Sequence, residues 1–313
     1  MGRNWPFIYL SELSFCLTMP SSCPFYRLQA AGYSLLARIA RKRCFGYATM
    51  KAHLQGKSGL EFGGPSSIFS GNHLIPIYGI VRSIDNCNFA QQTIWSSKKD
   101  HKKFGSNLGK RLIVDACDAS VIADEAYDFV AASHVLEHVA NPLRALQEWK
   151  RILRPSGTIL VVVPHKAGMF DRRRPFTTFD HIKADFESNV TEADLTHLQE
   201  ILELHDLELD PPAGSSEQFR QRCLQNLSKR AMHHHVFSPE LLVEMFNLID
   251  MRVLNVAVER PYHTIVQAEK PNQLEQGSVQ MENAEFLDPE ADWHKRSPFK
   301  SISKSPLFEG SDD

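Results

Sequence analysis

Acidic residues and adjacent glycines follow short apolar runs of this 313-residue chain. The run Gly59 to Phe62 contains Glu61 and leads into Gly63-Gly64, where the backbone can turn tightly and approach a ligand because glycine has no side chain. A second acid, Asp85, follows the next apolar run, where a carboxylate at a strand end can accept the hydroxyl hydrogens of a ribose. The pattern is compatible with a nucleotide-like ligand, and a plain tight turn at the two glycines is the alternative interpretation. Adjacent glycines without the GxGxxG spacing do not favour a pyrophosphate site.

A third carboxylate, Asp118, and its neighbour Ala119 follow another apolar run, Arg111 to Ala116. In an open parallel sheet the carboxyl ends of neighbouring strands meet in one crevice, so these residues are candidates for the same site. An aspartate after a strand also serves as a turn or capping residue, and both interpretations of Asp118 remain open.

Histidines are the second group with chemical potential, since imidazole can act as a general base near neutral pH or bind a metal. A metal site that combines His233-His234-His235 with His197 or His205 is one hypothesis. Side chains of contiguous histidines diverge, so at most some can face one centre, and the remainder would pack or bond to backbone. We therefore expect no bound metal. The candidates are His134, His138, His165, His181, His197, His205 and His233 to His235, with Asp171 nearby.

Overall composition excludes several classes of protein. Lys and Arg number 35 against 37 Asp and Glu, and the resulting net charge of −2 does not favour nucleic acid as a partner. Six cysteines without a CxxC pair suit free thiols in a reducing compartment, so we expect a cytoplasmic protein. No run is apolar for the roughly 18 residues that a membrane helix needs. Residues 1–23 are expected to be a loose extension, with a targeting peptide as the alternative.

The elements that position these residues follow from hydrophobic periodicity. Short β-rich runs alternate with helical patterns, which predicts an α/β fold with a Rossmann-like, mostly parallel seven-stranded sheet, helices on both faces and a closing antiparallel hairpin. The best-defined helix is NPLRALQEWKRILRPSG, started by Asn141 and Pro142, and a second, SPELLVEMFNLI, begins at Ser238. The predicted strands are 59–62, 80–84, 111–116, 127–132 and 158–163, and residues 251–270 are expected to form the hairpin.

The same patterns divide the chain into parts. Residues 1–56 are expected to be an extension with one or two amphipathic helices, and residues 57–270 the main domain. The strand alternation breaks at about 165–235, which predicts a functional insertion with structure of its own. The polar stretch 271–313 is expected to be disordered.

The run 127–139, YDFVAASHVLEHV, and the following NPLRALQEWKRILRPSGTILVVVP resemble the fourth strand, the next helix and the fifth strand of class I S-adenosylmethionine-dependent methyltransferases, in particular type 11-like domains. In that family a D-x-V strand leads to a vLeHv turn and then to a helix ending in L+PGG. Here Ser156-Gly157 replaces the glycine pair. The stretch LEFGGPSSIF also resembles LEIGGPS, a variant of the first cofactor motif that keeps an acid and the first glycine.

This resemblance implies S-adenosylmethionine as the cofactor and assigns residues to it. The acceptor is expected to be a small molecule or a sugar or lipid headgroup that reaches the site through the insertion. His134 and His165 are the candidate catalytic histidines. The implied cofactor residues are Glu61, Gly63 and Gly64 in the first motif, Asp85 at the ribose, Asp118 with Ala119 at the adenine, and Ser133 and His134 near the methionine moiety.

Two other functions compete with an active methyltransferase. The reduced glycine motif is compatible with a domain that has lost turnover and acts as a binding or regulatory module. A metal-dependent hydrolase built on the histidines would instead hold stoichiometric metal. Cofactor binding discriminates between the three, and the sequence leaves the acceptor and the oligomeric state open.

Overall fold

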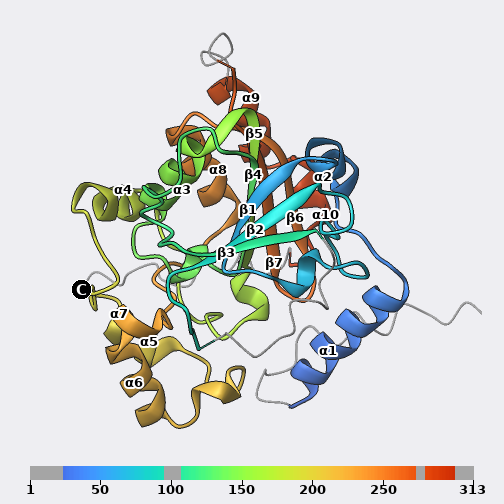
Figure 1. Cartoon of the computed structure of the whole chain (residues 1–313). Helices are drawn as coiled ribbons and strands as arrows, with labels where there is room; N and C mark the ends of the chain where they lie inside the picture. The colour runs from blue at the N-terminus through green and yellow to red at the C-terminus, as the bar shows by residue number, and fades with distance from the viewer. Residues whose placement is uncertain (1–23, 95–106, 273–278, 300–313) are drawn as a thin grey trace, which may run out of the picture.

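The structure is a computed structural model, and it describes residues 24–94, 107–272 and 279–299. Its centre is a seven-stranded sheet with the order β3-β2-β1-β4-β5-β7-β6 (Figure 1). Strands β1 to β5 pair in parallel, and β7 lies antiparallel between β5 and β6, which confirms the predicted mostly parallel sheet with a closing hairpin. The strands are β1 Ser58–Phe62, β2 Ser83–Asn88, β3 Leu108–Ile113, β4 Tyr127–Ser133, β5 Leu153–Pro164, β6 Arg252–Glu259 and β7 His263–Glu269.

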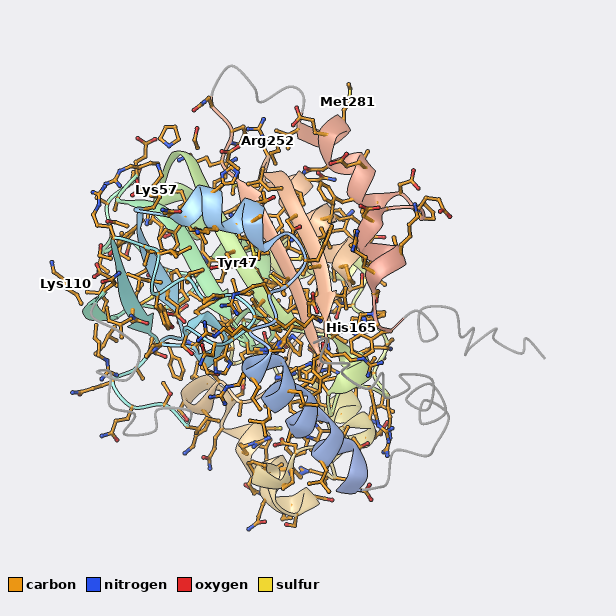
Figure 2. The ribbon with its side chains drawn as sticks, turned by 90° about the vertical axis from the view of Figure 1, so that its right-hand side faces the viewer. Tyr47, Lys57, Lys110, His165, Arg252 and Met281 are labelled. Carbon is orange, nitrogen blue, oxygen red and sulfur yellow. The ribbon has the colours of Figure 1, made fainter. Side chains whose placement is uncertain are left out.

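The two faces of the sheet bury separate apolar cores, because successive side chains of a strand point to opposite sides. In β4, Val130 and Ala132 face the core under α3 (Pro142–Arg151) and α8 (Pro239–Leu248), whereas Phe129 and Ala131 face the opposite core. That second core is covered by α2 (Tyr47–Leu54) and by the segment 68–81 (Figure 2). Helices therefore cover both faces, as predicted.

Helix α3 begins and packs as its sequence predicts. The Asn141 side chain accepts a hydrogen bond from the Arg144 N–H at 3.1 Å, and Pro142 occupies the first turn, where no N–H is needed. The fully buried Trp149 stacks on Phe62 of β1 with ring centroids 4.8 Å apart. This contact joins the helix to the strand that carries the first predicted motif, and truncation of such a tryptophan costs about 3–5 kcal/mol.

Two predicted strands are shifted in the structure. Residues 80–84 were expected to form the second strand, but the Ile80 and Val81 N–H groups donate to the Ile77 carbonyl in a turn, and β2 runs through 83–88. The third strand ends at residue 113 and not at 116. An apolar run marks burial, and a buried turn produces the same signal as a strand. Strand β2 contains the buried Asn86, which the apolar pattern could not assign to a strand.

The ends of the main domain also contain structure. Helices α1 (Pro24–Ile39) and α2 correspond to the predicted amphipathic helices. Part of the stretch expected to be disordered forms α9 (Val279–Leu287) and α10 (Asp292–Arg296). The buried Asn283 side chain accepts from the Val253 N–H and donates to the Met251 carbonyl, which anchors α9 to the start of β6. A single amide and a few apolar side chains secure this polar segment, a pattern that composition does not reveal.

The insertion lies between β5 and α8 and is mostly helical. It contains α4 (Phe179–Glu187), α5 (Leu198–Leu204), α6 (Ser216–Leu224) and α7 (Asn226–Lys229), the last three grouped to one side of the sheet (Figure 1). The connection from β1 to β2 contains the 3-10 helix η2 (Ser67–Phe69), and a second such helix, η4 (Leu136–His138), follows β4. Among the described helices, none has the length and apolar character to cross a membrane.

Candidate active-site cavity

A cavity of about 750 Å³ opens at the carboxyl ends of β1 to β4, where the strand order reverses. This is the position at which open α/β sheets bind ligands, and the volume suits a small-molecule site. The insertion supplies the opposite wall. The lining residues are Phe62, Gly63, Cys87, Asn88, Phe89, Ile94, Val114, Asp115, Ala116, Ser133, His134, Val135, Glu137, His138, Val139, Met169, Phe170, Asp210, Pro212, Arg222, Arg230, Ala231 and His233.

The first predicted motif divides between the cavity and the core. Gly63 lines the cavity with a φ of 75°, and a Cβ at this position would lie 2.4 Å from Cγ2 of Val135, so only glycine fits. Glu61 is fully buried and accepts hydrogen bonds from the Ser66 N–H at 3.0 Å and the Tyr78 hydroxyl at 2.8 Å. Burial raises the pKa of Glu61 to about 7, although these hydrogen bonds oppose the shift.

Glu61 therefore holds the turn from inside the protein and does not line the cavity. Gly64 is likewise placed behind the turn, because a Cβ there would overlap the side chains of Asn86 and Glu61. Of the first motif, the structure brings only Gly63 to the cavity surface.

Asp85 also lies away from the cavity, in the middle of β2. Its carboxylate accepts hydrogen bonds from the Tyr127 hydroxyl at 2.8 Å and from the Lys110 N–H at 2.7 Å. Because β2 extends to residue 88, the cavity-lining polar residue at the strand end is Asn88, whose amide donates to the Gly64 carbonyl at 3.2 Å. Of the two residues, Asn88 lines the cavity and Asp85 does not.

The shift of β3 has the same consequence for the next carboxylate. Asp118 is exposed and accepts from the Ser120 N–H, and the Ala119 N–H donates to Glu148, so neither residue lines the cavity. Asp115 takes the cavity position and pairs with Arg230 of the insertion at 2.8 Å. The carboxylate that lines the cavity after β3 is therefore Asp115, three positions before the predicted Asp118.

The end of β4 places its two predicted residues in the cavity. Ser133 and His134 both line it, and His134 has a φ of 55°, which aims the chain back across the strand end. His134 Nε2 lies 3.1 Å from Nδ1 of His263, and its Nδ1 lies 3.4 Å from Glu137 Oε1. Both ring nitrogens of His134 are therefore engaged by neighbouring side chains.

Glu137, His138 and His233 form a group at the insertion side of the cavity, which we call the cavity cluster. The Glu137 carboxylate is almost fully buried, and among the described residues neither oxygen accepts a hydrogen bond. His138 Nδ1 lies 3.1 Å from the Met232 carbonyl and therefore carries the proton. His233 Nδ1 lies 2.5 Å from the buried carboxylate of Asp171.

Charges inside this cluster compensate one another. Burial acts to raise the pKa of Glu137, but the nearby imidazoles, His134 first, hold it below its usual value. Burial lowers the pKa of His138 to about 3, so its ring is neutral. For His233 burial acts to lower the pKa, and the Asp171 carboxylate outweighs it and raises the pKa above the ordinary 6.5. Asp171 remains ionised because His233 opposes the effect of its burial and brings its pKa to about 2.

The second candidate catalytic histidine, His165, does not line the cavity. It follows the end of β5 and stacks on Phe299 with ring centroids 4.5 Å apart (Figure 2). Burial lowers the pKa of His165 to about 4, and its Nδ1 accepts a hydrogen bond from the Ala167 N–H. The geometry gives it a capping role at the turn after β5.

Several cavity residues were not predicted to be part of the site. Glu137 lies within the LEH turn, and its burial is visible only in the fold. Asn88 and Asp115 were missed because the strand ends were misplaced, so a better strand boundary would have found both. His233 and His138 were among the candidate histidines, and the structure selects them from that larger set.

Comparison with known proteins finds matches to one family model and to solved structures. A family model described as a methyltransferase domain matches residues 71–161. No curated protein matches the chain. Similar solved structures include a SAM-dependent methyltransferase from Aquifex aeolicus, at 13% identity over 72% of this chain and 90% of that one with a TM-score of 0.41. A putative S-adenosylmethionine-dependent methyltransferase from Listeria monocytogenes has 15% identity over 72% and 99% of the two chains, with a TM-score of 0.40.

A third is the trans-methyltransferase CalH in complex with SAH, at 17% identity over 72% of this chain and 54% of that one, with a TM-score of 0.42. The family match includes the end of β4 and the helix that follows it, which carry the motifs quoted from the sequence. Together with the seven-stranded, mostly parallel sheet, this match confirms the resemblance to class I S-adenosylmethionine-dependent methyltransferases that the sequence indicates, and the family model itself covers residues 71–161.

Proposed function

We propose that this protein binds S-adenosylmethionine in the 750 Å³ cavity and transfers its methyl group to a small acceptor molecule that carries a hydroxyl or amine. The cavity at the strand-order reversal, within a methyltransferase domain, is the observation that carries the proposal. The first turn supports it, because Gly63 presents its backbone to the cavity without a side chain, and Val135 packs where a Cβ would lie.

Residues at the strand ends would hold the cofactor. The Asn88 amide can accept a hydrogen bond from one ribose hydroxyl through its oxygen and donate one through its nitrogen. Asp115, which Arg230 holds in place, offers a carboxylate further along the same edge. Ser133 and His134 form the floor at the end of β4. The bound cofactor would supply an electrophilic methyl group on a sulfonium centre.

The cavity cluster would act on the acceptor. A hydroxyl or amine acceptor must lose a proton, and His233 is the candidate general base because Asp171 fixes its Nδ1 and leaves Nε2 as the atom that can take the proton. Asp171 also raises the pKa of His233, which strengthens it as a base. Other hydroxyl groups of the methyl-accepting molecule can donate hydrogen bonds to His138 and to the Glu137 carboxylate. His138 is neutral and so has one ring nitrogen with a lone pair, and both carboxylate oxygens are hydrogen-bond acceptors.

The insertion narrows the choice of acceptor. Met169, Phe170 and Pro212 give one wall of the cavity an apolar surface, while Arg222 is neutralised by Asp210 at 2.8 Å. This combination favours a compact polar molecule, or a single headgroup, over an extended polymer. Substrate positioning and exclusion of water by the insertion would then provide much of the rate acceleration.

Calorimetric titration with S-adenosylmethionine and S-adenosylhomocysteine tests the proposal. We expect Asn88→Ala to weaken binding by roughly tenfold, through a lost hydrogen bond at a buried polar contact. Asp118→Ala is the matched control, because Asp118 is exposed outside the cavity, and it should bind as the unaltered protein does. Failure of the unaltered protein to bind either compound would contradict an active methyltransferase and favour the alternative of a non-catalytic binding module.

A further inference from the structure

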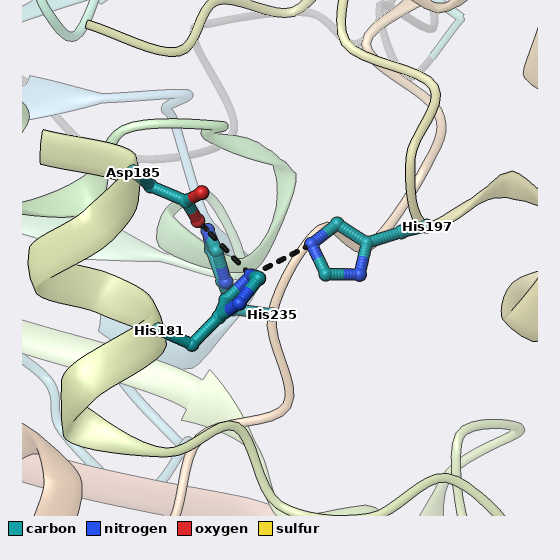
Figure 3. A group of neighbouring side chains, drawn as sticks. All are labelled: His181, Asp185, His197 and His235. Atoms are coloured by element: carbon teal, nitrogen blue, oxygen red, sulfur yellow. Dashed lines mark hydrogen bonds and ion pairs between the residues drawn. The ribbon is translucent and has the colours of Figure 1, made fainter. Parts of the chain in front are cut away.

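The three consecutive histidines of the insertion point in different directions. His233 lines the cavity, whereas His235 turns away from it and is fully buried beside α4. There it joins His181 and Asp185 of α4 and His197, the residue before α5 (Figure 3). We call these four residues the α4 cluster. None of them lines the cavity, so the proposed methyl transfer does not explain why they are gathered.

The four side chains each offer one donor atom, and these atoms lie within 4.8 Å of one another. His181 and Asp185 are one helical turn apart and so project from the same face of α4. His181 Nε2 lies 3.0 Å from His197 Nε2 and 3.2 Å from Asp185 Oδ2. The same Oδ2 lies 3.6 Å from His235 Nε2, which also lies 3.1 Å from the Ala140 carbonyl and would exchange that contact for the metal. The three segments that meet here are distant in sequence, with His181 and His235 54 residues apart.

These separations fit a tetrahedral metal site. Four nitrogen and oxygen ligands at 2.0–2.1 Å from a zinc ion stand about 3.3 Å from one another, at the corners of a tetrahedron. Three of the six donor separations, 3.0, 3.2 and 3.6 Å, lie near that value, and all six are within 4.8 Å. A hydrogen-bonded network explains the group less well, because two imidazole Nε2 atoms at 3.0 Å share one proton and His235 Nδ1 is buried with no hydrogen-bond partner among the described residues.

The chemistry of the donors also suits a cation. Imidazole nitrogens and a carboxylate oxygen are ligands that zinc takes in proteins. His181, with 39% of its side chain exposed, leaves a path from solvent to the site.

We propose that His181, Asp185, His197 and His235 bind one divalent transition-metal ion, with zinc as the best match to three imidazoles and one carboxylate at tetrahedral spacing. Four protein ligands close the coordination shell, which is the arrangement of a structural site. The ion joins α4, the start of α5 and the segment before α8. Because His235 is two residues from His233, the ion also fixes the backbone that carries the proposed general base.

Metal content of the intact chain tests this site directly, and it does so without any assay of methyl transfer. The purified protein is stripped with a chelator, reloaded with excess Zn²⁺, desalted and measured by elemental mass spectrometry. We expect about one equivalent of zinc, and below about a tenth of an equivalent in His181→Ala and in Asp185→Asn. Asp180→Asn is the matched control, since Asp180 is exposed on the same helix and pairs with Lys183, and it should retain the full equivalent.

Cobalt provides a second measurement that needs no variant. Co²⁺ bound to the stripped protein should give the intense visible absorption of a tetrahedral site, and an octahedral spectrum would overturn the assignment. Less than about a tenth of an equivalent of zinc in the unaltered protein, or full zinc content in His181→Ala, would also overturn it. Glu137→Gln should keep the zinc, and its loss there with retention in His181→Ala would move the metal to the cavity cluster.

Discussion

The molecule gathers histidines beside a carboxylate twice, and the two groups differ in their access to ligand. The cavity cluster lines a 750 Å³ space, and its histidines are oriented by partners behind them: Asp171 for His233 and the Met232 carbonyl for His138. In the α4 cluster the donor atoms face one another, and none faces the cavity. The first arrangement leaves atoms available for an acceptor, and the second brings four donor atoms within 4.8 Å of one another, which we propose is the site of one ion.

One extended segment supplies both groups, since His233 and His235 are two residues apart. Side chains at this spacing on an extended chain often share a face, but here the bonds to Asp171 and to the Ala140 carbonyl hold the two rings in different surroundings. The comparison teaches that residue type does not decide the role of a histidine in this protein. The role depends on which group binds one ring nitrogen and on whether the ring lines the cavity.

The largest expected effect follows from removing the proposed general base, His233, from the cavity cluster. His233→Ala should lower the rate of methyl transfer by about 10²–10³-fold, because a positioned general base contributes on that order, while affinity for S-adenosylhomocysteine stays unchanged. Asp171→Asn should reproduce most of the loss, since the buried carboxylate orients the ring and raises its pKa. Single-turnover rates with saturating cofactor measure the effect.

His165→Ala is the control for that experiment. His165 was predicted to be catalytic from its place after the fifth strand, but it lies outside the cavity, and we expect turnover within about threefold of the unaltered protein. A rate as low as that of His233→Ala would return the catalytic role to His165 and contradict the assignment of the base to the cavity cluster.

Removal of the proposed metal should affect stability before chemistry. An ion that binds only the folded state stabilises it by about 4 kcal/mol at a free concentration of a thousand times its Kd. Chelation should therefore lower the unfolding temperature of the unaltered protein and leave that of His181→Ala unchanged. Equal shifts in both proteins would mean that the chelator acts at another place. Urea unfolding with and without chelator gives the free energies.

Glu61 is a buried carboxylate without a histidine partner, and its effect on stability can be measured through pH. Its pKa is raised from 4.5 to about 7 by burial, so the folded state favours the protonated form and loses stability as pH rises through 7. Glu61→Gln lacks this titration. The difference in free energy of unfolding between Glu61→Gln and the unaltered protein should shift in favour of the variant by on the order of 2–3 kcal/mol from pH 5 to pH 8. Denaturant unfolding at the two pH values checks the difference, and parallel curves would refute the raised pKa.

The sequence was sufficient for the elements with strong periodicity. Helix α3 has a cap, a first-turn proline and an apolar stripe, and β4 and β5 are runs of apolar residues in a parallel sheet, so each local signal agreed with the tertiary structure. Ser133 ends β4 and His134 follows it, so the well-predicted strand brings both to the cavity. The family resemblance was carried by the same stretch.

Elsewhere the sequence signal and the fold diverged. Strand β2 contains polar residues, and the buried turn before it contains apolar ones. The end of the second strand was therefore predicted too early in the sequence, and the residue chosen at that end does not line the cavity. The α4 cluster could not be predicted because its donors come from three segments whose packing no local pattern encodes. The direction of each ring in the triple histidine likewise depends on distant partners such as Asp171.

The smallest expected effect concerns Asp85, the residue that the shifted strand removed from the cavity. Asp85→Ala breaks the hydrogen bond from the Tyr127 hydroxyl and should cost about 1 kcal/mol of stability, the usual value for one such bond. Its affinity for S-adenosylmethionine should change by less than about twofold, whereas Asn88→Ala changes it by roughly tenfold. Calorimetric titration of Asp85→Ala and Asn88→Ala decides which of the two residues binds the ribose. A tenfold loss of affinity in Asp85→Ala would mean that the second strand ends after the apolar run 80–84, as the sequence predicted, and that Asp85 faces the cofactor.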